Sequence, residues 1–181
     1  LAILATGPLV GAWADAHAAK KKLLLLSTAG CVLFTAALYY AGPGGVALAL
    51  ILVALSNYFF GTGENLIAAF LPELADSRAM GRVSGWGWSF AYLGGLAALG
   101  ICLAYILGSG RPASESVPVT MLITAGFFLV AATPTFLFLR ERAVPQAMES
   151  PWKRMLQTAR NATAYRDLFR FLICIVFYQA G

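Results

Sequence analysis

Val83–Leu107 reads VSGWGWSFAYLGGLAALGICLAYIL and contains no charged side chain. A helix of about 20 apolar residues is long enough to cross the hydrocarbon core of a bilayer. Three further segments reach this length: Leu23–Ala41, Ala47–Phe70 with the single charge of Glu64, and Pro118–Leu139. Polar and apolar residues do not alternate along them as they would in a membrane β-strand. The sequence therefore predicts an all-α, polytopic transmembrane helix bundle.

The overall composition agrees with this prediction and excludes several classes of protein. Hydrophobic residues make up 60% of the 181 residues and charged residues only 12%, with a mean hydropathy of +0.75. Soluble domains carry about twice that share of charged residues. A soluble enzyme and a nucleic-acid-binding module are therefore excluded, and the lipid bilayer is the expected partner.

Basic residues outnumber acidic residues by 13 to 8, and their positions indicate the topology. They follow alternate segments: Lys20–Lys22 after the first, Arg78 and Arg82 after the third, and the stretch from Arg140 after the fifth. Arg111 is the exception. Basic loops are retained in the cytoplasm. We therefore expect a multi-pass protein of a bacterial inner (plasma) membrane, with its basic loops in the cytoplasm.

The chain begins and ends inside apolar runs, Leu1–Ala14 and the run from Leu168, which are both too short to span a bilayer. We therefore expect an interior fragment of a longer chain, whose C-terminal half is missing. Its parts are an N-terminal transmembrane bundle truncated at its start (1–140), a cytoplasmic central loop (141–167) and the truncated start of a C-terminal transmembrane bundle (168–181). Ser150-Pro151 is a favourable helix start. It predicts an amphipathic helix in the loop, lying on the membrane surface or serving as a solvated linker.

No catalytic or metal-binding motif is present in the sequence. His17 is the single histidine and has no second ligand at metal-binding spacing, and the three cysteines are scattered without a CxxC pair. We expect no enzymatic activity, no catalytic residue, no cofactor and no metal ion.

Glu64 is the only charged residue well inside a predicted span. Inserting such a charge costs at least about 2.5 kcal/mol, and the residue usually faces a cavity or a partner. Asn57 lies two helical turns earlier, and Asn65 and Tyr58 adjoin the same polar region. These four residues form a candidate substrate or ion pathway, with Glu64 binding a coupling proton or a cationic group of a small-molecule substrate. A structural ion pair between Glu64 and an arginine elsewhere in the full protein is the alternative.

Gly87, Gly94 and Gly95 recur at helical spacing with alanines inside Val83–Leu107. Lipid provides no hydrophobic force between helices, so helices associate through close contacts between small residues. We expect these glycines to mediate helix packing, in which the helices either stay fixed or slide against one another. Pro134 is predicted to kink its helix and act as a hinge.

Gly11 and Asp15 have the spacing G-x-x-x-D, and Lys20–Lys22 follows shortly afterwards. At the membrane border Asp15 can pair with a cation or with the positive end of a neighbouring helix. The pattern resembles the signature loop between the second and third helices of the major facilitator superfamily. Where the family pattern continues with Arg and then Gly, this chain has Ala16 and Ala18. The resemblance implies a cytoplasmic gate motif formed by Gly11 and Asp15.

A second block contains LPELA (71–75), GRVSGWGW (81–88) and YLGGL (92–96). It is similar to the branch of this superfamily that includes the fungal vacuole effluxers and bacterial members named only as unknown major facilitators. On this resemblance the fragment runs from the second helix to the start of the seventh. The resemblance implies secondary active transport of a small solute, such as an amino acid, by alternating access. A non-transporting receptor or assembly scaffold with the same helix bundle is the alternative.

Overall fold

The computed structural model describes residues 2–42, 44–139, 141, 170 and 174. Their helices are α1 (Ala2–His17), α2 (Lys20–Ala37), the short 3-10 helix η1 (Leu38–Tyr40), α3 (Val46–Leu74), α4 (Met80–Ser109) and α5 (Ala113–Phe138). α2 with η1, α3, α4 and α5 are each long and apolar enough to cross a membrane. The predicted all-α, polytopic bundle is therefore confirmed for this part of the chain. The predicted loop helix at Ser150 lies outside the described residues.

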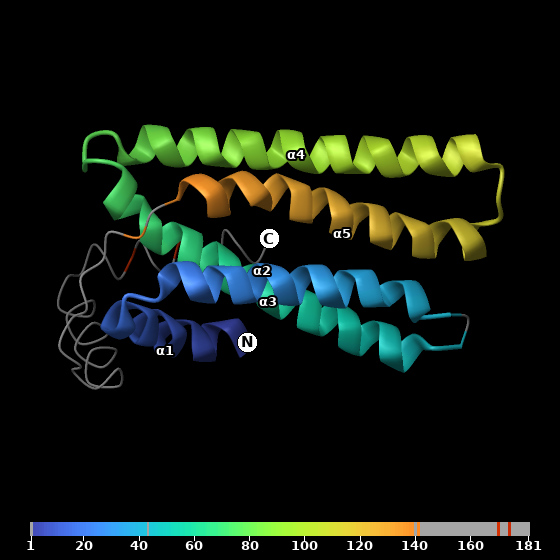
Figure 1. Ribbon diagram of the computed structural model, residues 1–181, viewed down its shortest axis with the longest axis horizontal. Coiled ribbons are helices and arrows are strands. Elements are labelled where there is room, and N and C mark those ends of the chain that lie inside the picture. The colour runs from blue at the N-terminus through green and yellow to red at the C-terminus, as the bar shows by residue number, and fades with distance from the viewer. Residues whose placement is uncertain (1, 43, 140, 142–169, 171–173, 175–181) are drawn as a thin grey trace.

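The long helices run side by side and alternate in direction (Figure 1). The turns between α1 and α2 and between α3 and α4 lie at the same end of the bundle as the C-terminal end of α5. This end, called the basic end below, carries Lys20–Lys22, Arg78 and Arg82, whereas Arg111 lies at the opposite end. The predicted grouping of basic residues at one end is therefore confirmed for these residues.

The helices extend beyond the apolar segments that the sequence marks as spans. α2 begins at Lys20, so the three lysines predicted as a loop form its first turn. α3 continues through Pro72 to Leu74, and α5 begins at Ala113, before Pro118. Hydropathy marks only the part of a helix that lies in hydrocarbon, whereas the helical backbone continues into the polar headgroup region. The helices are therefore longer than the predicted spans at these ends.

α2 and α3 pack most closely through small residues. A Cβ at Gly30 of α2 would lie 2.7 Å from Cγ of Phe59, and a Cβ at Gly63 of α3 would lie 3.4 Å from Oγ of Ser27. Thr35 Oγ1 and Ser56 Oγ are 2.7 Å apart and form a hydrogen bond between the two helices. Small residues and interhelical hydrogen bonds are the usual means of helix association in lipid.

α4 stands apart from α2 and α3 and packs against α5 (Figure 1). None of its residues is buried. Cys102 contacts α5, with its Sγ 3.8 Å from the carbonyl oxygen of Thr120. A Cβ at Gly87, Gly94 or Gly95 would meet no atom of the described residues within 4 Å. Packing through these three glycines therefore stays a prediction, and their faces are open in this part of the protein.

α5 is a continuous helix through Pro134 and ends at Phe138. The hydroxyl of Thr133 donates a hydrogen bond to the carbonyl oxygen of Leu129, 2.9 Å away. This carbonyl is not the one that Pro134 leaves without an N–H donor, which belongs to Val130, four residues before the proline. The role of Pro134 as a hinge stays a prediction.

Gly30→Ala is expected to destabilise the protein, because the new Cβ would clash with the ring of Phe59. We expect a loss of about 1–3 kcal/mol from overpacking, although alanine is the better helix former by about 1 kcal/mol. Gly100→Ala in α4 is the matched control, since no atom of the described residues lies within 4 Å of its new Cβ. Thermal unfolding in detergent measures the melting temperatures of both purified variants. Equal melting temperatures for Gly30→Ala and the wild type would contradict the close α2–α3 contact.

Candidate functional site

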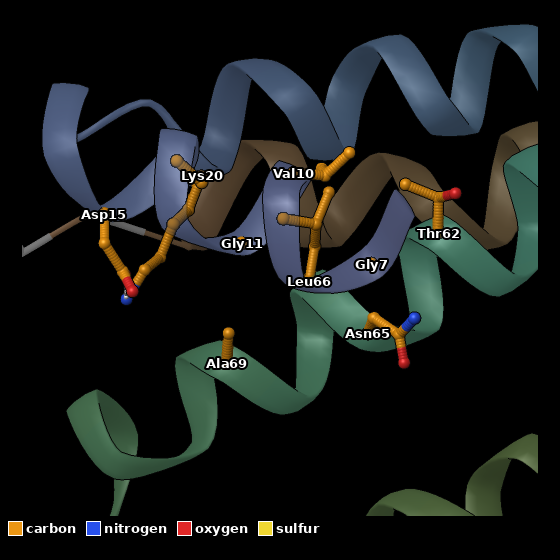
Figure 2. A pocket seen from close by; sticks show the side chains of 10 residues that line it. Gly7, Val10, Gly11, Asp15, Lys20, Thr62, Asn65, Leu66 and Ala69 are labelled. Atoms are coloured by element: carbon orange, nitrogen blue, oxygen red, sulfur yellow. Dashed lines mark ion pairs between the residues drawn. The ribbon is translucent and has the colours of Figure 1, made fainter. Parts of the chain in front are cut away.

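Asp15 forms an ion pair with Lys20, as Figure 2 shows. The Lys20 Nζ atom lies 3.0 Å from Oδ1 of Asp15 in α1 and 2.9 Å from Oε1 of Glu73 in α3. The Lys20 side chain is only 11% exposed, and an ammonium group buried to this extent needs opposite charges beside it. The predicted pairing of Asp15 with a cation is confirmed. One lysine thus joins the ends of α1, α2 and α3.

Glu141 binds the first turn of α2. Its Oε1 accepts a hydrogen bond from the backbone N–H of Lys20 at 2.7 Å, and its Oε2 accepts one from the backbone N–H of Lys21 at 3.3 Å. A carboxylate at a helix N-terminus satisfies free N–H groups and interacts favourably with the helix dipole. This contact explains how a helix can begin with three lysines, whose positive charges oppose that dipole.

Lys21 connects the same turn to the end of α5. Its Nζ donates a hydrogen bond to the carbonyl oxygen of Leu139 at 2.7 Å, where a cation is favourable because the carbonyls at a helix C-terminus are unpaired. We call the five residues that make these contacts the Lys20 cluster: Asp15, Lys20, Lys21, Glu73 and Glu141. The cluster joins four helices at the basic end.

Of the Lys20 cluster, the sequence indicates Asp15 and the lysines that follow it, but it assigns no role to Glu73 or Glu141. Glu73 is the single acidic residue of the LPELA block (71–75), near the end of α3. A lone acidic residue at this position is the one sequence feature that indicates an ion pair there. Glu141 carried no local signal, because its partners are about 120 residues earlier in the chain. In the part of the chain that the structure describes, no three His, Cys, Asp or Glu side chains gather as metal ligands.

A small cavity of about 80 Å³ lies between α1 and α3 next to the Asp15–Lys20 pair. Gly7 and Gly11 line it from α1, and Leu66 points from α3 toward α1 (Figure 2). A Cβ at Gly7 would lie 3.4 Å from Nδ2 of Asn65, whereas a Cβ at Gly11 would meet no atom of the residues that the structure describes within 4 Å. The contact between this face of α1 and α3 is therefore made at Gly7, one turn before Gly11.

A larger cavity of about 460 Å³ lies between α2, α3, α4 and α5. Its wall includes Leu24 from α2, Glu64 from α3, Trp88 from α4 and Phe128 from α5. Glu64 is the one charged residue among the described residues that line it. The cavity therefore combines an apolar, partly aromatic wall with a single carboxylate.

The structure divides the four predicted pathway residues between two faces of α3. Glu64 lines the larger cavity, whereas Asn65 lines the small cavity beside α1. Tyr58 also faces α1, where its hydroxyl donates a hydrogen bond to Oγ1 of Thr6 at 3.1 Å. Asn57 is exposed and donates to a backbone carbonyl of its own helix. Successive residues of a helix are about 100° apart, so Glu64 and Asn65 face different neighbours.

The turn between α1 and α2 places Ala18 at a φ of 46°, in the left-handed region. This position is the one at which the major facilitator pattern has glycine. A left-handed conformation costs an L-residue other than glycine about 1–2 kcal/mol. Alanine therefore strains the turn that brings Lys20 to Asp15.

Ala18→Gly is expected to stabilise the protein by about 1 kcal/mol, because glycine adopts positive φ without steric cost. Ala16→Gly is the matched control, since Ala16 lies inside α1 and glycine in a helix costs about 1 kcal/mol. Thermal unfolding in detergent should give opposite shifts for the two variants. A lower melting temperature for both would show that Ala18 is not strained.

Comparisons with known proteins agree with the bundle of long apolar helices. The family described as vacuole effluxer Atg22 like matches residues 3–181. An uncharacterized MFS-type transporter, YxiO of Bacillus subtilis (strain 168), is 27% identical over 187 residues, which cover 97% of this chain and 43% of that protein. No solved structure matches the chain. The chain therefore belongs to the Atg22-like vacuole effluxer family, a branch of the major facilitator superfamily of membrane transporters.

Proposed function

We propose that this chain is part of a secondary active transporter that moves a small solute, such as an amino acid, by alternating access. The observation that carries the proposal is the Lys20 cluster, which joins α1, α2, α3 and the end of α5 at the basic end. Ion pairs and hydrogen bonds can break and re-form without repacking a core, and transport cycles use such contacts between two conformations. The family supports transport in general.

In this proposal the basic end faces the cytoplasm of a bacterial cell, because basic ends of membrane helices are retained there. Asp15 and Lys20 then form the gate at the cytoplasmic mouth. The Asp15 side chain is 40% exposed, whereas that of Lys20 is 11% exposed. Water therefore reaches the aspartate side of the ion pair, so the two side chains can separate at a moderate cost in free energy.

Glu64 is the proposed pathway residue. It is exposed, lines the larger cavity, and lies about 15 Å along α3 from Leu74, at 1.5 Å per residue. In this proposal it binds a coupling proton or a cationic group of the solute, whereas Asn65 and Tyr58 face α1 and belong to a separate polar region. The chain spans less than half of its curated relative, so in this proposal the remaining helices of the protein complete the solute site.

Asp15→Asn and Lys20→Met are each expected to lower solute transport by about tenfold, because each removes one partner of a partly buried ion pair. Lys22→Met is the matched control, since Lys22 is an exposed lysine of the same turn. Uptake of a panel of amino acids and ions into vesicles containing the full-length protein measures transport. Quantification of the protein in the vesicles separates lost activity from lost insertion.

Unchanged uptake by Asp15→Asn at equal protein content would remove Asp15 from the gate. An absence of wild-type uptake of every amino acid, ion and organic amine tested would instead favour a receptor or scaffold with the same bundle.

A further inference from the structure

The larger cavity has an uneven chemistry that points to a class of ligand. Glu64 supplies its one charge, and no Lys, Arg or His is among the described residues that line it. We propose that this cavity binds an organic ammonium ion with an aromatic or other apolar body, in preference to a free amino acid. The inference rests on the proposed transport function, for which it names the substrate class.

Glu64 provides the negative charge. Within the described ranges, no hydrogen bond or ion pair involves its carboxylate. A carboxylate at this depth in a membrane helix is costly unless it has a partner or faces water. An ammonium group of a ligand that enters the cavity would provide that partner and would form charge-assisted hydrogen bonds with it.

The aromatic side chains provide a second feature that favours a cation. Phe60, Trp88 and Phe128 reach the cavity from three different helices. The ring centroids of Phe60 and Phe128 are 6.1 Å apart. The faces of aromatic rings attract cations, and tryptophan does so most strongly. The same rings can also cover an aromatic or aliphatic ligand body.

The volume of about 460 Å³ is suited to such a ligand. Sites for small molecules usually enclose about 300–1,000 Å³ and are mostly apolar, with a few polar groups that set orientation. Ser27 and Ser84 also line the cavity. The Ser27 hydroxyl donates its hydrogen bond to the carbonyl oxygen of Leu24 in its own helix, so its proton is not available to a ligand.

Within the wall that the structure describes, an amine fits better than an amino acid, because no basic residue there can pair with a carboxylate. The carboxylate of an amino acid would lose its hydration in the cavity and would be repelled by Glu64. An amine with the same apolar body lacks this group and avoids both costs. Phenethylamine and phenylalanine form such a pair, because they differ only by the carboxylate.

The test measures binding of radiolabelled phenethylamine and phenylalanine to the full-length protein in detergent, together with their uptake into vesicles. We expect phenethylamine to bind at least about tenfold more tightly than phenylalanine. Glu64→Gln should weaken amine binding by about tenfold, because it removes the charge. Glu115→Gln, an exposed carboxylate at the opposite end, should bind the amine as the wild type does.

A second pair of variants tests the aromatic wall. Trp88→Leu should weaken amine binding by about fivefold, because the leucine side chain cannot form a cation–π contact. Trp86→Leu should leave it unchanged, since Trp86 is an exposed residue of the same helix that does not line the cavity.

Tighter binding of phenylalanine, no binding of the amine, or equal amine binding by Glu64→Gln and the wild type would each overturn the proposed ligand class. Uptake of phenylalanine without binding of the amine would overturn the ligand class and leave the transport function intact. Amine binding that is sensitive to Glu64→Gln, without uptake of any solute, would support the site and contradict transport.

Discussion

The ammonium group of Lys20 is buried between carboxylates from two other helices, and the arrangement of the basic end depends on this contact. A charge removed from water must be paired, so α1 and α3 have to bring Asp15 and Glu73 to the same point. Glu141 then holds the backbone of the same turn. The hydrophobic cluster of Ala14, Leu24, Leu66 and Phe70 lies at the same end. Charge pairing and apolar packing therefore both hold α1, α2 and α3 together at the basic end.

The sequence predicted the helices well because hydropathy and span length are local properties of the chain. Val83–Leu107, for example, lies entirely within α4. The ion pairs were harder to predict, because Lys20 and Glu73 are 53 residues apart and no periodicity relates them. The sequence also predicts a loop where α2 has its first turn. The carboxylate that caps this turn belongs to Glu141, which is 121 residues away from Lys20 in the chain. Contacts between distant residues were thus the part that the sequence did not reveal.

α3 is the wall that the two cavities share. Glu64 and Asn65 are adjacent in sequence, yet one lines the cavity toward α4 and the other lines the cavity toward α1. Glu73, two to three turns further along the same helix, belongs to the Lys20 cluster. A rigid helix that carries all three residues would link the Lys20 cluster to both cavities, because it cannot move at one of these sites without moving at the others.

The separation of α4 from α2 and α3 has a consequence for how the protein is made. α4 is joined to α5 by the short turn around Gly110, whose φ is 61°, and it packs along that helix. Two apolar helices connected in this way can enter the bilayer together as a hairpin while the ribosome is still translating. The hairpin can then dock on the preceding helices through α5, whose end reaches Lys21. In this order of assembly, α4 would still have no buried residue after docking, because it contacts the preceding helices mainly through α5.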